Sequence, residues 1–256
     1  MGGQTALVTG ASSGIGAELA RLCAADGHDV VLVARDAGRL AELAASLTRD
    51  HRVQARILPA DLSDPASPQR IFDELRATSI DLLINNAGLG LRGPFASADW
   101  DASAGLMQVN MTAPVHLTRL FLPGMLERRR GRVLMVASTA AFVPGPFMAL
   151  YYASKAFLLS FSEAVANEVK GTGVTVTAVC PGPTSTEFAR RAGSSGSRLF
   201  HGPVMTAGEV AREGYRAMME GRAVWITGAR NRWLIRGARL APRAMVVERA
   251  RRLNLD

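Results

Sequence analysis

Short runs of apolar, β-favouring residues alternate along the chain with longer stretches in which apolar positions recur at helical spacing. The short runs are almost continuously apolar, which is typical of strands buried on both faces of a parallel sheet. We interpret seven of them as strands. They are Thr5–Thr9, Val30–Ala34, Val53–Leu58, Asp81–Asn85, Val133–Ala137, Val174–Cys180 and Val224–Thr227.

The intervals between these strands carry the helical pattern, so the chain alternates strand and helix from end to end. This order predicts an α/β fold with a doubly wound, seven-stranded parallel sheet, because right-handed crossovers place helices on both faces. No linker or repeat divides residues 1–227, which we expect to form one domain. The predicted helices are Gly14–Asp26, Ala37–Thr48, Pro68–Ala77, Ala102–Arg129, Tyr151–Val169 and Ala207–Glu220.

Two segments interrupt this rhythm. Residues 184–205 form a long stretch rich in Gly and Ser that follows the carboxyl end of a strand, where open α/β sheets bind ligands. We predict a substrate loop or lid there, with a surface insertion as the alternative. Residues 228–256 form a basic, amphipathic C-terminal extension. It either lies on an anionic membrane surface or packs on the body or at a subunit interface with a solvated arginine face.

Composition narrows the class of protein. The chain has 256 residues, 48% of them apolar, which suits a globular enzyme. Of the net charge of +8, the extension supplies +6 through eight arginines and two acids, so nucleic-acid binding is not expected of the body. Cys23 and Cys180 lack any metal or redox spacing and are expected to be buried thiols in a reducing cytosol. We expect no metal site and a cytoplasmic protein, with membrane association through the extension left open.

The turn after the first strand is suited to a phosphate-bearing cofactor. A helix N-terminus attracts pyrophosphate through its unpaired N–H groups, and glycines allow its close approach. The strand–turn–helix context strengthens what is otherwise a weak glycine motif. The residues expected to bind there are Gly10, Ser12, Ser13, Gly14, Ile15 and Gly16.

The tip of the second strand bears on the choice of dinucleotide. An acid there would bind the adenosine ribose and select NAD, whereas the tip is Ala34 followed by Arg35. Arginine grips a 2′-phosphate bidentately, so we favour NADP and regard NAD as the alternative. Asp36 is interpreted as the N-cap of the following helix.

Two further strand ends carry candidate cofactor residues. Asp61 and Leu62 follow the third strand, and Asp61 is expected to bind the adenine amino group, with a plain turn aspartate as the alternative. Asn86, Ala87 and Gly88 close the fourth strand, where small residues let backbone approach the adenosine.

The candidate reaction chemistry lies in the second half of the chain. Tyr151 is four residues before Lys155 and shares its helix face, whereas Tyr152 points about 100° away and is expected to be structural. A positive charge beside a phenol lowers its pKa, so Lys155 should make Tyr151 an effective proton donor to a carbonyl oxygen. Ser138 would hold that oxygen in place.

Taken together, these motifs resemble the short-chain dehydrogenase/reductase family, in its NADP-preferring branch. The matches are Thr9–Gly16, Asp61, Asn85–Gly88, Asn110, Ser138, Tyr151–Lys155 and Pro181–Thr184, in order and spacing from about residue 5 to 186. The resemblance implies a Rossmann-like domain, a nicotinamide cofactor and a homodimer or homotetramer. It implies that Lys155 and Tyr151 contact the cofactor, that Asn110 holds a water in a proton chain, and that a strand end clamps the nicotinamide amide. That clamp comprises Pro181, Gly182, Thr184 and Thr186.

The expected activity is reduction of a ketone or aldehyde to an alcohol, or its reverse, on a small hydrophobic substrate. Few charges occur among the residues expected to line the pocket, which favours an apolar carbonyl over a sugar or organic acid. An NAD-dependent alcohol dehydrogenase of the same fold and a non-catalytic dinucleotide-binding regulator are the alternatives. The predicted pocket residues are Leu91, Phe95, Ala140, Phe147, Phe188 and Phe200.

Overall fold

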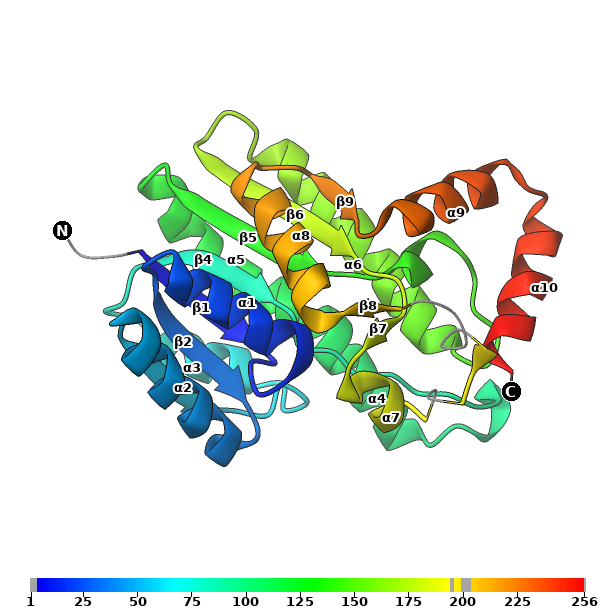
Figure 1. Ribbon diagram of the computed structural model, residues 1–256, viewed down its shortest axis with the longest axis horizontal. Helices are drawn as coiled ribbons and strands as arrows, with labels where there is room; N and C mark the ends of the chain where they lie inside the picture. The colour runs from blue at the N-terminus through cyan, green and yellow to red at the C-terminus, as the bar shows by residue number, and fades with distance from the viewer. Residues whose placement is uncertain (1–3, 194–195, 199–203, 256) are drawn as a thin grey trace.

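A seven-stranded parallel sheet forms the centre of the protein, as the sequence predicts (Figure 1). The computed structural model describes residues 4–193, 196–198 and 204–255. Strands lie in the order β3-β2-β1-β4-β5-β6-β9, so the direction of winding reverses between β1 and β4. The strands are β1 (Thr5–Thr9), β2 (Asp29–Ala34), β3 (Ala55–Pro59), β4 (Ile80–Asn85), β5 (Gly131–Val136), β6 (Val174–Cys180) and β9 (Val224–Ile226).

Neighbouring residues of each strand enter opposite halves of the core. Ala6 and Val8 belong to one buried cluster, whereas Leu7, between them, belongs to the other. This follows from the two-residue period of a strand, and it explains why the runs are apolar at every position.

Three helices cover each face. The first cluster is closed by α1 (Gly14–Ala25), α2 (Ala37–His51) and α8 (Ala207–Met219). The second is closed by α3 (Ser67–Glu74), α5 (Ala113–Glu127) and α6 (Ala149–Glu168). Figure 1 shows α1 and α8 side by side over the sheet, with the α5 and α6 layer behind it.

The long helix predicted over Ala102–Arg129 is wrong in one respect. The segment is α4 (Trp100–Met107), a π-helical turn η2 (Gln108–Thr112) and then α5. Pro114 has no N–H to donate to the carbonyl of Asn110 four residues earlier, which favours a change of hydrogen-bonding pattern at this point. The π turn therefore coincides with Asn110.

The segment predicted as an irregular lid is partly ordered. β7 (Thr184–Ser185) pairs with β8 (Met205–Thr206), and α7 (Glu187–Arg191) follows β7 directly. Two short 3-10 turns, η1 (Phe95–Ser97) and η3 (Thr139–Phe142), follow β4 and β5.

The C-terminal extension folds as two helices, α9 (Ala229–Leu240) and α10 (Arg243–Asn254), which we call the C-terminal arm. Figure 1 shows the arm at the β9 edge of the sheet, on the opposite side of the molecule from α2. In the described part of the chain, no helix combines the length and apolar character needed to cross a membrane.

Candidate active site

One cavity of about 270 Å³ lies at the carboxyl ends of the central strands. This is the edge at which open α/β sheets bind ligands, next to the reversal between β1 and β4. Ser138, Tyr151 and Lys155 all line it, together with most of the residues predicted to bind the cofactor. Those are Gly10, Ser12, Ser13, Gly14, Ile15, Asn86, Ala87, Gly88, Pro181, Gly182, Thr184 and Thr186.

The glycine turn is shaped by close backbone contacts. Gly10 has a φ of +66°, a conformation that favours glycine, and a Cβ on Gly16 would lie 2.3 Å from the carbonyl oxygen of Gly10. Ser13, the N-cap of α1, makes no side-chain capping bond, and the first turn carries no acidic residue. The first-turn N–H groups of α1 therefore suit an anionic group such as pyrophosphate.

Asn86 fastens this turn to the neighbouring strand. Its side-chain amide donates to the carbonyls of Thr9 at 2.9 Å and Gly10 at 3.2 Å, and its own N–H donates to the Thr9 hydroxyl at 3.0 Å. The Thr9 hydroxyl in turn donates to the carbonyl of Ile84. These bonds tie β1 to β4 at the point where the order of the strands reverses.

Two of the predicted cofactor residues, which do not line the cavity itself, form a loose ion pair. The guanidinium of Arg35 lies 4.0 Å from the Asp61 carboxylate, and both side chains are largely exposed. Asp61 also accepts bonds from the N–H and hydroxyl of Ser63, as a turn aspartate does. Asp36 accepts a 3.0 Å bond from the N–H of Arg39, which confirms it as the N-cap of α2. Leu62 is buried in the core instead of facing the cavity.

Tyr151 is half-buried and lines the cavity. Its ring lies 5.4 Å from that of Phe188 and 6.0 Å from that of Tyr152, measured between centroids. Burial raises the pKa of Tyr151 to about 12, while hydrogen bonding with Ser138 opposes this rise. Burial, and not the neighbouring Lys155, therefore sets the direction of this pKa shift.

Lys155 is buried beneath Tyr151. Its Nζ donates a 2.8 Å bond to the carbonyl of Val136 and lies 5.8 Å from the centroid of the Tyr151 ring. Burial lowers the pKa of Lys155 to about 8. An ammonium with this pKa exchanges its proton close to neutral pH, which suits a proton relay.

Asn110 uses its side chain to hold the adjacent loop. Its Oδ1 accepts from the N–H of Leu89 at 2.8 Å, and its Nδ2 donates to the carbonyl of Leu89 at 2.9 Å and to the Ser154 hydroxyl at 3.0 Å. A Cβ on Gly88 would lie 3.5 Å from both Asn110 Oδ1 and Lys155 Nζ. Asn110 thus lies beside Lys155 but with its amide already bonded.

The predicted pocket residues separate into two groups. Ala140 and Phe188 line the cavity, together with Met148 and Tyr152, which the sequence did not single out for it. Leu91 lines a second cavity nearby, and Phe147 contacts the Arg251 guanidinium. Phe95 is 63% exposed on η1, and Phe200 lies outside the described residues. Aromatic character alone does not reveal which way a loop side chain turns.

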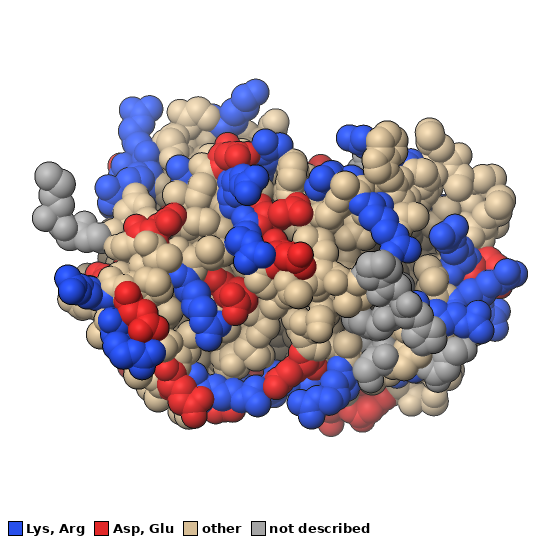
Figure 2. Space-filling view, in the orientation of Figure 1, with Lys and Arg blue, Asp and Glu red and all other residues tan. Residues whose placement is uncertain are grey.

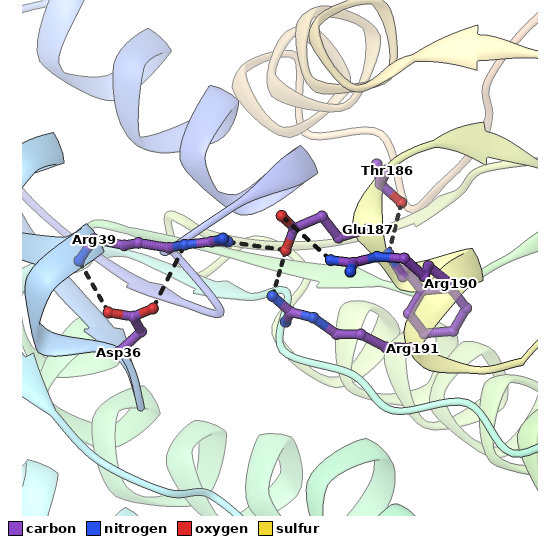
Figure 3. A network of polar contacts seen from close by, with 7 residues as sticks. Asp36, Arg39, Thr186, Glu187, Arg190 and Arg191 are labelled. Atoms are coloured by element: carbon purple, nitrogen blue, oxygen red, sulfur yellow. Dashed lines mark hydrogen bonds and ion pairs between the residues drawn. The ribbon is translucent and has the colours of Figure 1, made fainter.

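An ionic network joins α2 to α7, next to Thr186, which lines the cavity (Figure 3). Arg39 on α2 donates a 2.9 Å bond to Glu187 on α7, which also pairs with Arg190 and Arg191. The bond from Arg39, and secondarily the pair with Arg191, lower the pKa of Glu187. Thr186 beside it faces the glycine turn, since a Cβ on Gly14 would lie 3.2 Å from its Cγ2.

The C-terminal arm also supports the site. A Cβ on Gly182 would lie 2.4 Å from Nδ2 of Asn231 on α9, so that side chain packs directly on the strand-end loop. Asn254, at the end of α10, is fully buried and bonded to Tyr152. No local pattern marks these two asparagines, because their partners lie far away along the chain.

Comparisons with known proteins point to one family. Residues 4–195 match a family model described as short chain dehydrogenase. A very-long-chain 3-oxoacyl-CoA reductase from Aspergillus clavatus is 37% identical over 180 residues, covering 68% of this chain and 52% of its own. The chain thus spans about half the length of the curated relatives it matches first.

Solved structures resemble nearly the whole chain. A short-chain dehydrogenase from Sphingobium yanoikuyae in complex with NADPH has a TM-score of 0.84 at 36% identity, covering 93% of this chain and 94% of its own. A bulky-bulky ketone specific alcohol dehydrogenase from Comamonas testosteroni has a TM-score of 0.80 at 31% identity, covering 94% and 93%.

Proposed function

The chain belongs to the short-chain dehydrogenase family, and we propose that it is an NADP(H)-dependent reductase of a hydrophobic ketone or aldehyde. The observation that carries the proposal is the convergence of Ser138, Tyr151 and Lys155 on the cavity that begins at the glycine turn. A nicotinamide cofactor would supply or accept the hydride, and side chains of the protein would donate or accept the proton.

Each of the three side chains has a distinct role in this proposal. With a pKa of about 12, Tyr151 keeps its phenol protonated at neutral pH and donates that proton to the carbonyl oxygen. The Ser138 hydroxyl orients the same oxygen. Lys155, with a pKa of about 8, returns a proton toward Tyr151. Asn110 supports this relay through its backbone carbonyl oxygen. In an α-helix that oxygen would accept a bond from the N–H of residue 114, but Pro114 has no N–H.

Cofactor binding is assigned from the fit of the cleft. The open first turn of α1 would hold the pyrophosphate, and Arg35 would hold the 2′-phosphate of NADP. Asp61 would face the adenine with the carboxylate oxygen that Ser63 does not occupy, and the loop from Pro181 to Thr186 would hold the nicotinamide. The Sphingobium enzyme was solved with NADPH, which is consistent with this choice.

The substrate is proposed to be apolar because the inner part of the cavity is. Phe188, Met148, Ala140 and Leu89 line it around the Tyr151 ring. The ketone-specific dehydrogenase among the similar structures is consistent with such a substrate. We further propose a homodimer or homotetramer, to be checked by analytical ultracentrifugation.

The chain's three tyrosines provide a matched test. Tyr151→Phe removes the proton donor and is expected to lower kcat for ketone-dependent NADPH oxidation by roughly 100-fold or more. Tyr215→Phe, which breaks only a 2.8 Å bond to Asp26 on the far side of the core, should leave kcat nearly unchanged. Full activity in both Tyr151→Phe and Lys155→Ala would contradict the proposal.

A further inference from the structure

The outer face of α9 carries an exposed apolar stripe. Trp233 is 70% exposed and Leu240 is 89% exposed, and their separation of seven positions corresponds to about two helical turns. Their side chains therefore project on the same side, with Gly237 between them. Met245, at the start of α10, is 65% exposed and extends the apolar surface beyond the helix end.

The inner face of the arm is fixed to the body. Ile235 is buried, and Arg232 donates a 3.0 Å bond to the carbonyl of Ile226 and lies over the Trp225 ring. Asn254 is fully buried at the other end of the arm. The exposed stripe is thus presented by helices that are held at both ends.

Basic side chains flank this stripe. Arg230, Arg236 and Arg243 are exposed, and the Arg236 guanidinium lies 5.4 Å from the centroid of the Trp233 ring. From residue 228 onward the sequence holds eight arginines against two acids. Figure 2 shows the corresponding region, at the upper right, as mainly uncharged and basic surface in which acidic side chains are sparse.

We infer that the C-terminal arm docks on an anionic lipid bilayer. Trp233, Leu240 and Met245 enter the headgroup region, and the flanking arginines pair with lipid phosphates. Charge decides against a second copy of the chain as the occupant, because pairing this face with itself would bring two strongly basic surfaces together. An anionic surface is complementary to the arginines and accepts the apolar stripe as well.

Vesicle sedimentation of the full chain tests this directly. Binding is expected to vesicles of phosphatidylcholine with phosphatidylglycerol, to weaken as salt is raised, and to be nearly absent with phosphatidylcholine alone. The double variant Trp233→Ser/Leu240→Ser should lower the partition coefficient about tenfold or more. Arg236→Gln/Arg243→Gln should lower it severalfold.

Trp100 offers a matched control, since it is 67% exposed but lies on α4, outside the arm. Trp100→Ser should leave vesicle binding unchanged, and all variants should keep the wild-type melting temperature and affinity for NADPH. In a Trp100→Phe background, anionic vesicles should shift the tryptophan emission to shorter wavelength.

Three outcomes would overturn the inference. They are equal binding to both kinds of vesicle, an equal loss in Trp100→Ser, and no binding at low salt. Sedimentation velocity without lipid distinguishes the rival occupant. Were Trp233→Ser/Leu240→Ser to dissociate an oligomer while vesicle binding was absent throughout, the stripe would be an interface between copies of the chain.

Discussion

The hydroxyl of Tyr152 donates a 3.0 Å hydrogen bond to Oδ1 of Asn254, a residue 102 positions further along the chain. The Asn254 side-chain amide also donates to the carbonyl of Pro146 at 2.9 Å. The backbone carbonyl of Asn254 accepts a bond from Nε of Arg92 at 2.8 Å. One buried side chain thus ties the end of the arm to the helix that carries Tyr151 and Lys155, and to the loop before that helix.

Asn254→Ala is expected to destabilise the protein and loosen the substrate side of the site. It leaves the Tyr152 hydroxyl and the Pro146 carbonyl without this buried partner, which costs about 1–3 kcal/mol. Because Tyr152 lines the cavity, KM for the ketone should rise more than kcat falls. Urea unfolding and steady-state kinetics measure the two effects.

Arg252→Ala is the control for this variant. It breaks only an exposed ion pair with Glu248, so the free energy of unfolding should change by less than about 1 kcal/mol. Equal effects of the two substitutions would mean that Asn254 has no special structural role.

The buried ammonium of Lys155 predicts a specific pH dependence of stability. Its pKa is lowered from 10.5 to about 8, so between these values the unfolded chain holds a proton that the folded chain has lost. The contribution of Lys155 to the free energy of unfolding therefore rises as pH rises from about 8 to 10.5, by about 1.4 kcal/mol per pH unit.

The variant Lys155→Met lacks this dependence. Relative to the variant, the wild type should gain stability as pH rises from about 8 to 10.5, measured by urea unfolding without cofactor. Tyr151 is present in both proteins and cancels in the difference. Parallel stability profiles over this range would show that Lys155 keeps an ordinary pKa when folded.

Removing the charge of Glu187 should strengthen the binding of NADPH. Glu187 accepts a 2.9 Å bond from Arg39 (Figure 3), so Glu187→Gln removes a negative charge beside the proposed phosphate site and leaves Arg39 paired with Asp36, at 3.5 Å. We expect the Kd for NADPH to fall about two- to fivefold, with a smaller change for NADH, in fluorescence titrations. Glu74→Gln, which breaks an exposed pair with Arg56 on another part of the surface, should change neither.

Arg35 should discriminate between the two dinucleotides. Arg35→Ala removes the proposed partner of the 2′-phosphate, so NADPH binding should weaken roughly tenfold or more while NADH binding changes little. Calorimetric titration with both cofactors measures this independently of turnover. An equal loss for both would place the 2′-phosphate elsewhere.

The sequence by itself was sufficient for the fold and for the helix that carries Tyr151 and Lys155. Both rest on short-range order: the two-residue alternation that sends Ala6 and Leu7 to opposite faces, and the four-residue spacing that places Tyr151 and Lys155 on one side of α6. The capping of α2 by Asp36 is likewise local, and so is the glycine turn between β1 and α1.

Only the tertiary structure decided what surrounds those groups. It showed that burial raises the pKa of Tyr151 and lowers that of Lys155, that Phe95 turns outward, and that Asn231 and Asn254 brace the site from the arm. Desolvation and long-range hydrogen bonds depend on which distant segments come into contact. Those contacts cannot be inferred from the periodicity of the sequence.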